Sequence, residues 1–257
     1  RQEYKSIGIN LALGPMADTA TEPRWTRVDG TFGEDANINA KLTAAYIKGL
    51  QGNSINSESV LAMVKHFPGS GSVEEGNDSH FPPGNHIYPG NNFKYHLLPF
   101  EAAFDVGVSS VMPYYGIPVG ISDKEVGASF DEYIITDLLR DKYNFNGIIC
   151  SDWALITDRI LPNGKMFKPA SAFGLEDKST EERITELLNA GIDMIGGESL
   201  TNNLVELIKT GIISEKRIDE SLKRIMKQKF QLGLFDNPYI KLSSLKNLDN
   251  KKFINKG

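Results

Sequence analysis

The sequence contains a single cysteine, Cys150, among its 257 residues. An intrachain disulfide and a cysteine-based zinc site are therefore excluded. No apolar run approaches the roughly 20 residues that a membrane-spanning helix needs, so we expect no membrane partner. Positive charge is not in excess either, because the formal net charge is −5, and this argues against a nucleic-acid partner. The composition does not indicate a cellular compartment.

Histidine is also scarce. The four histidines, His66, His80, His86 and His96, form neither an HxH nor an HExxH pattern. We therefore expect no metal, and we assign no other cofactor. The hydrophobic share of 40% and the charged share of 24% are those of an ordinary globular protein.

Apolar runs bounded by glycine or proline recur along the chain, and most are followed by a segment with helical periodicity. This alternation is typical of a parallel α/β sheet. We predict strands at 7–14, 60–66, 108–113, 147–151 and 192–196. We predict helices at 34–51, 93–106, 131–142, 180–190, 201–209 and 218–232. In the first helix, the periodicity places Ile38, Leu42, Ala45 and Leu50 on the inner side, and Ser179 with Glu182 forms a capping box before the fourth.

Three long loops, 15–33, 67–92 and 153–178, follow predicted strands. Long loops of a compact domain usually carry function, and in parallel barrels the active site lies at the carboxyl ends of the strands. Polar or aromatic residues stand where the five strands end: Asp18, Arg24 and Arg27; Lys65 and His66; Tyr114 and Tyr115; Asp152 and Trp153; Glu198.

These residue types suit a carbohydrate site, because cationic side chains and histidine donate hydrogen bonds to hydroxyl groups, aromatic rings stack on pyranoses, and a carboxylate can attack an anomeric carbon. Each residue alone also has a structural explanation. Asp152 could cap a helix or pair with a cation, and Lys65 could reach solvent beside a buried His66. Their joint occurrence on one predicted face favours the sugar site.

Short motifs follow one another along the chain. They read GPMAD at 14–18, PRWTR at 23–27, FGED at 32–35, KHFPG at 65–69, VMPYY at 111–115 and GIICSDW at 147–153. Together, and in this order, they resemble the motifs of glycoside hydrolase family 3 over about residues 7–239. Thr26 stands where the family usually has glycine.

The resemblance implies a (β/α)8 TIM-like barrel in residues 1–240, incomplete because only about five parallel strands are recognisable. Residues 241–257 would form a linker or tail toward a following domain. We expect about two or three strands of the barrel to lie before the first residue.

The resemblance further implies a retaining, exo-acting β-glycosidase that takes a carbohydrate substrate, most simply a β-glucosidase. Asp152 would be the nucleophile, with Tyr115 close to it and Trp153 stacked near the scissile bond. Arg27, Lys65 and His66 would bind hydroxyls of the terminal sugar. A β-N-acetylhexosaminidase, a β-xylosidase and a non-catalytic carbohydrate-binding fragment are the alternatives.

A retaining glycosidase also needs an acid that protonates the leaving oxygen. In one branch of the family this acid is a histidine paired with an aspartate, and Asp78 with His80 matches that dyad in type, at a spacing about two residues longer. In many other members it is a glutamate on a following domain, which would have to complete the site from outside this chain. Glu198 is a further candidate.

Overall fold

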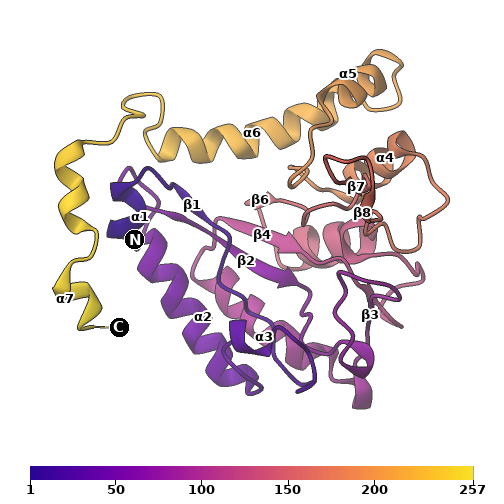
Figure 1. The fold of residues 1–257 in the computed structure, drawn as a ribbon, viewed down its shortest axis with the longest axis horizontal. Coiled ribbons are helices and arrows are strands. Elements are labelled where there is room, and N and C mark those ends of the chain that lie inside the picture. The colour runs from indigo at the N-terminus through magenta and orange to yellow at the C-terminus, as the bar shows by residue number, and fades with distance from the viewer. Residues whose placement is uncertain (257) are drawn as a thin grey trace.

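The computed structural model describes residues 1–256 of the chain. Its centre is a parallel sheet of β1 (Leu11–Ala12), β2 (Leu61–Phe67), β4 (Ser110–Pro113) and β6 (Ile148–Ile149), hydrogen-bonded in the order β1-β2-β4-β6 (Figure 1). An isolated parallel bridge from Cys150 to Met194 continues the sheet beyond β6. The predicted parallel α/β class is confirmed.

Three predicted strands are much shorter than expected. Of the predicted strand 147–151, only Ile148 and Ile149 form β6. The chain before β1 forms helix α1 (Gln2–Ser6), and of the predicted strand 7–14 only Leu11 and Ala12 have strand geometry. The carbonyls of Asn10 and Gly14 still accept hydrogen bonds from the amides of Leu61 and Met63 in β2. The predicted strand 192–196 is reduced to the bridge at Met194. There the carboxylate of Asp193 accepts a 2.9 Å hydrogen bond from the amide of Ile149, so a side chain replaces part of the backbone ladder.

All six predicted helices are present, with ends shifted by up to three residues. They are α2 (Ala36–Gln51), α3 (Phe93–Asp105), the π-helix Tyr133–Lys142, α4 (Thr180–Ala190), α5 (Thr201–Lys209) and α6 (Glu215–Gln231). The capping box before α4 is confirmed, since the Ser179 hydroxyl accepts from the amide of Glu182 and the Glu182 carboxylate accepts from the amide of Ser179.

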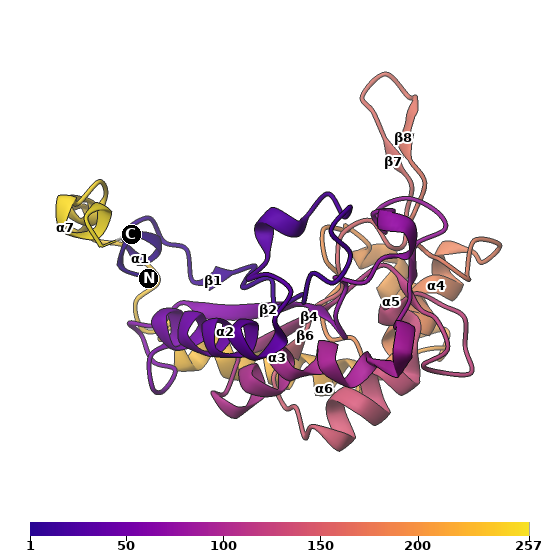
Figure 2. The same cartoon turned by 90° about the horizontal axis from the view of Figure 1, so that it is seen from below.

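The two faces of the sheet differ. One face carries the main hydrophobic core, to which Val64 and Val111 belong, and α2, α3 and α6 lie on this side (Figure 2). The other face has only a small cluster of Met63, Met112 and Cys150, and loops and a hairpin stand over it. Because side chains alternate along a strand, Lys65 shares this second face with Met63.

Helix α2 is rotated relative to the prediction. Ile38 and Leu42 are 53% and 44% exposed, whereas Asn39 and Thr43 are fully buried. Buried hydrogen bonds cause this rotation, because the Asn39 amide donates to the carbonyls of Ala17 and Asp18 at 3.1 and 3.2 Å. The helix therefore turns its polar stripe toward the loop after β1, and the predicted inner face is wrong except at its last residue, Leu50.

The remaining elements are small. Strands β3 (Asn85–His86) and β5 (Ile117–Pro118) form one parallel pair, and β7 (Arg159–Ile160) and β8 (Met166–Lys168) form an antiparallel hairpin. Short 3-10 helices span Val28–Gly30, Glu74–Gly76, Pro89–Asn91, Ala128–Phe130 and Leu242–Asn247. Helix α7 (Lys251–Ile254) ends the described chain, and the C-terminal segment lies beside α1 (Figure 1), where Asn247 donates to the Ser6 hydroxyl at 3.1 Å.

Candidate active site

The five residues assigned to one site by sequence come together at the carboxyl ends of three neighbouring strands. Lys65 and His66 lie at the end of β2, Tyr115 follows β4, Asp152 follows β6, and Arg27 reaches them from the loop after β1. Parallel strands end at the same edge of a sheet, and this explains why residues far apart in the chain meet here.

Asp152 is held by two hydrogen bonds on one carboxylate oxygen. Its Oδ1 accepts from the Tyr115 hydroxyl at 2.9 Å and from the amide of Trp153 at 2.7 Å. Burial raises the pKa of Tyr115, and the Asp152 carboxylate raises it further, so the phenol stays protonated and donates. The second oxygen, Oδ2, is left without a hydrogen bond among residues 1–256.

His66 is a neutral acceptor facing this carboxylate. Its Nδ1 lies 2.7 Å from the buried carboxylate of Asp18. Burial lowers the pKa of His66 despite the opposing effect of Asp18, so we assign the proton to Nδ1 and an acceptor lone pair to Nε2. The Nε2 atom then accepts from Arg27 at 3.3 Å and lies 3.8 Å from Oδ2 of Asp152.

Two cations complete this part of the site. Arg27 donates to the Tyr114 hydroxyl at 2.8 Å. Burial and the charge of Arg27 lower the pKa of Lys65, and the carboxylates of Asp152 and Asp18 oppose this effect. Arg24, by contrast, forms an ion pair with Glu22 in the loop and is exposed, so the structure places Arg27 and not Arg24 in the site.

Trp153 presents an aromatic surface at the rim. It is 37% exposed, and its ring packs directly on Gly197, where an added Cβ would lie 1.9 Å from Cδ1 of the indole. Gly197 has a φ of +63°, so both its backbone conformation and the close ring contact require glycine. No sequence pattern marks Gly197 as part of the site.

Asp78 and His80 lie against the same site. Nδ1 of His80 is hydrogen-bonded to the Asp78 carboxylate, which also accepts from the indole of Trp25 at 2.9 Å. Burial raises the pKa of Asp78, but its hydrogen bonds to His80 and Trp25 outweigh this and hold that pKa well below the usual range. The imidazole ring lies 4.7 Å, centre to centre, from the ring of Tyr115.

Glu198 has a different environment from the one expected of an acid. Its carboxylate accepts from the amides of Ile156 and Thr157 at 3.2 and 3.3 Å and from the Thr157 hydroxyl at 2.6 Å. These contacts fix the loop after Trp153.

Sequence reasoning missed the contributions of three residues. The sequence marks Asp18 and Tyr114 only by their places near strand ends, whereas in the structure Asp18 orients His66 and Tyr114 accepts a hydrogen bond from Arg27. The third residue is Lys168, whose ammonium lies 4.8 Å from the ring centre of Tyr115. No periodicity or motif marks Lys168, because a long irregular loop separates it from Asp152.

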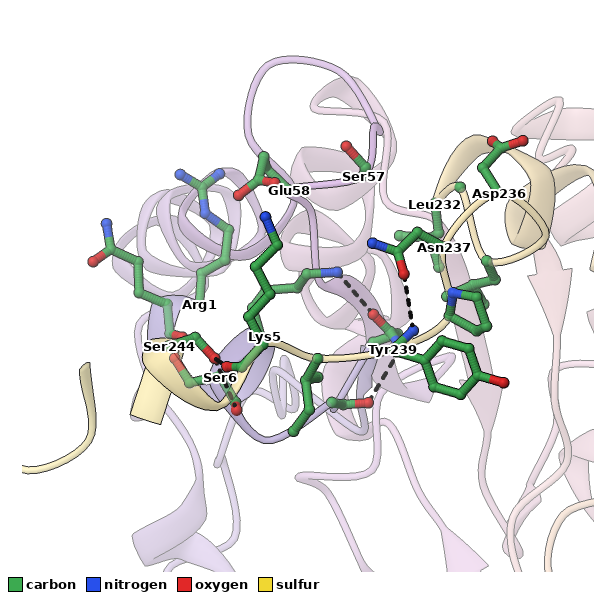
Figure 3. A pocket seen from close by; sticks show the side chains of 18 of the residues that line it. Arg1, Lys5, Ser6, Ser57, Glu58, Leu232, Asp236, Asn237, Tyr239 and Ser244 are labelled. Carbon is green, nitrogen blue, oxygen red and sulfur yellow. Dashed lines mark hydrogen bonds between the residues drawn. The ribbon is translucent and has the colours of Figure 1, made fainter. Parts of the chain in front are cut away.

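A large cavity of about 840 Å³ lies at the opposite edge of the sheet (Figure 3). It is bounded by α1, by Ser57 and Glu58 before β2, and by the chain from Leu232 to Asn247. Asn10 and Glu58 precede their strands, so this cavity is at the amino ends. The strand-end constellation around Asp152 lies at the other edge, and we place the chemistry there.

Within residues 1–256, no group of three or more His, Cys, Asp or Glu side chains is arranged to hold a metal ion. Over the same range, none of the helices combines the length and the hydropathy required to cross a bilayer.

Sequence comparison gives relatives that align along the whole chain. The chain is 46% identical to "Beta-glucosidase C" of Emericella nidulans over 260 residues, which cover 100% of this chain and 42% of that protein. It is 40% identical to "Periplasmic beta-glucosidase/beta-xylosidase" of Dickeya chrysanthemi over 93% of this chain and 39% of that protein. The chain thus spans about two fifths of these relatives.

Solved structures of beta-glucosidases have the same fold as this chain. The crystal structure of a beta-glucosidase from Listeria innocua superposes with a TM-score of 0.82 at 26% identity, covering 99% of this chain and 34% of the other. A complex of the same enzyme with glucose superposes with a TM-score of 0.79. The model of the glycosyl hydrolase family 3 N-terminal domain matches residues 1–228. The chain therefore belongs to glycosyl hydrolase family 3, of which it carries the N-terminal domain.

Proposed function

We propose that this chain supplies the nucleophile and the sugar-binding groups of a retaining exo-β-glucosidase. The observation that carries the proposal is the Asp152 carboxylate, which accepts hydrogen bonds from Tyr115 and Trp153 and has Nε2 of His66 3.8 Å away. Arg27 and Lys65 lie at the same carboxyl ends of the strands, and Arg27 donates to His66. The relatives named beta-glucosidase support glucose as the sugar. The name of the Dickeya relative makes xylose the second candidate.

In the first step, Oδ2 of Asp152 attacks the anomeric carbon, the glycosidic bond breaks, and its electron pair leaves with the aglycone oxygen, which an acid protonates. Arg27 and Lys65 donate to sugar hydroxyls, and Trp153 stacks at the rim of the pocket. In the second step, water attacks the same carbon and gives its proton to the conjugate base of that acid, and the electron pair of the ester bond returns to Asp152.

The acid has two candidate sources. The Asp78–His80 pair adjoins Tyr115, and the aspartate holds the imidazole by its Nδ1 so that Nε2 is free to serve as the acid. A carboxyl group contributed from outside this chain is the other source, roughly 5–5.5 Å from the nucleophile in a retaining enzyme. We also infer that the parallel sheet of this chain is part of a closed barrel.

The test uses the complete reading frame that contains this chain. The protein should release nitrophenol from 4-nitrophenyl β-glucoside, and Asp152→Asn should lower kcat by roughly 10⁴-fold or more. Asp177→Asn, at an exposed position, is the control and should leave kcat unchanged. The xyloside is assayed in parallel. Near-normal turnover by Asp152→Asn would refute the assignment of the nucleophile.

A further inference from the structure

The hairpin β7–β8 projects from the loop after Asp152 and stands above the sheet on the side of the site (Figure 2). The side chains along it are exposed, with Ile160, Met166 and Phe167 at 56%, 59% and 72%. Lys168, at the end of β8, and Arg159, which pairs with it in β7, are the exceptions, since both are only partly exposed. The ammonium of Lys168 turns toward the site.

The ammonium of Lys168 is fixed in place by two contacts. It donates a 2.6 Å hydrogen bond to the hydroxyl of Ser171 and lies 4.8 Å from the centre of the Tyr115 ring. Ser171 is itself buried, and its amide donates to the carbonyl of Ala154 at 2.8 Å. The hairpin base is thus tied to the strand end that carries Asp152.

Two carboxylates and one cation affect the charge of Lys168. Burial lowers the pKa of Lys168, and the carboxylates of Asp152 and Asp78 oppose that effect, while Arg159 adds to it. No ion pair within 4 Å joins Lys168 to either carboxylate in the described part of the chain. The ammonium therefore acts on Asp152 only by long-range electrostatic attraction and through its contact with the ring of Tyr115.

We propose that Lys168 is a positioning residue for the nucleophile, acting through Tyr115; the inference rests on the proposed function. Its charge over the ring holds the phenol in place and makes its O–H a stronger donor to Oδ1 of Asp152. This matters most in the second step, when water adds to the anomeric carbon, gives up a proton to the general base, and the electron pair of the ester bond returns to Asp152. The charge that reappears on Asp152 is stabilised by the O–H of Tyr115.

The consequence can be measured in the complete protein with 4-nitrophenyl β-glucoside, whose good leaving group makes the second step limiting. Lys168→Met should lower kcat about 10-fold and lower KM with it, because the glycosyl-enzyme accumulates. Lys168→Arg should retain kcat within about threefold, since a guanidinium also stacks on an aromatic ring. Lys165→Met, exposed at the tip of the same hairpin, should match the unmodified protein.

The outcomes separate the two proposals. A Lys168→Met protein with unchanged kcat, or with a lowered kcat at unchanged KM, overturns the inference, because a merely structural role reduces the active fraction without a KM change. If Asp152→Asn abolishes turnover while Lys168→Met leaves it unaltered, only the inference fails. Absence of turnover in the unmodified protein overturns the proposed function and, with it, this inference.

Discussion

The hydroxyl of Tyr115 donates a 2.9 Å hydrogen bond to Oδ1 of Asp152, although 37 residues separate them in the chain. Tyr115 follows β4 and Asp152 follows β6, its neighbour in the sheet, so the parallel pairing of these two strands creates the contact. The bond occupies one carboxylate oxygen and leaves the other to react.

Tyr115→Phe should lower kcat by roughly 10- to 100-fold, because a hydrogen bond to a charged group contributes about 1.5–3 kcal/mol. The ring and its packing are preserved in this variant, so the melting temperature should change little. The measurement is steady-state kinetics on an aryl β-glucoside, with Tyr133→Phe on the exposed side of the π-helix as a control. An unchanged kcat would show that the hydrogen bond has no role in turnover.

His80→Ala tests the dyad as the acid. Substrates with poor leaving groups, such as alkyl β-glucosides, should lose about 10²- to 10⁴-fold in kcat/KM, whereas nitrophenyl glucosides, which need no proton, should lose little. Asp78→Asn should show the same ratio, because the carboxylate orients the imidazole. Equal losses on both classes of substrate would mean that His80 only shapes the loop and that the acid lies elsewhere.

Gly197→Ala should displace the indole of Trp153, since the new Cβ would lie 1.9 Å from it. We expect KM to rise by roughly 10-fold as the stacking surface is lost. Gly164→Ala is a matched control, because Gly164 also has a positive φ, of +78°, but no atom lies within 4 Å of an added Cβ. A similar KM in the two variants would contradict a role for the Trp153 position.

Stability should fall as the pH decreases from 7 to 5. Burial lowers the pKa of both His86 and His96 to about 4, and Nδ1 of each has no hydrogen-bond partner among the described residues. The unfolded chain binds protons near pH 6.5 and the folded chain does not, so stability present above pH 6.5 is lost as pH falls toward 4. The slope should reach about 1.4 kcal/mol per pH unit for each histidine.

Urea unfolding at pH 7 and pH 5 measures this loss. His96→Phe should reduce it by about 2 kcal/mol, whereas the neighbouring Tyr95→Phe should leave it unaltered, because a phenol does not titrate in this range. An identical loss in the unmodified protein and in His96→Phe would show that His96 does not titrate on unfolding.

The sequence by itself determined the class of the fold and which residues meet at the carboxyl ends of its strands. The alternation of apolar runs and helical segments predicted the parallel sheet, and the motif around Asp152 together with those at 23–27 and 65–69 identified the residues that meet at its edge. These predictions succeed because local hydrophobic patterns indicate where each strand ends. Since the strands are parallel, their carboxyl ends lie at the same side of the sheet.

Tertiary structure alone decided the rest. The inner face of α2 could not be predicted, because buried hydrogen bonds from Asn39 to the loop after β1 override the apolar periodicity. The proton of His66 is placed by Asp18, which lies 48 residues away in the chain. Lys168 reaches Tyr115 only because an irregular loop folds back as a hairpin. Each of these depends on contacts between distant segments, and no local pattern records such contacts.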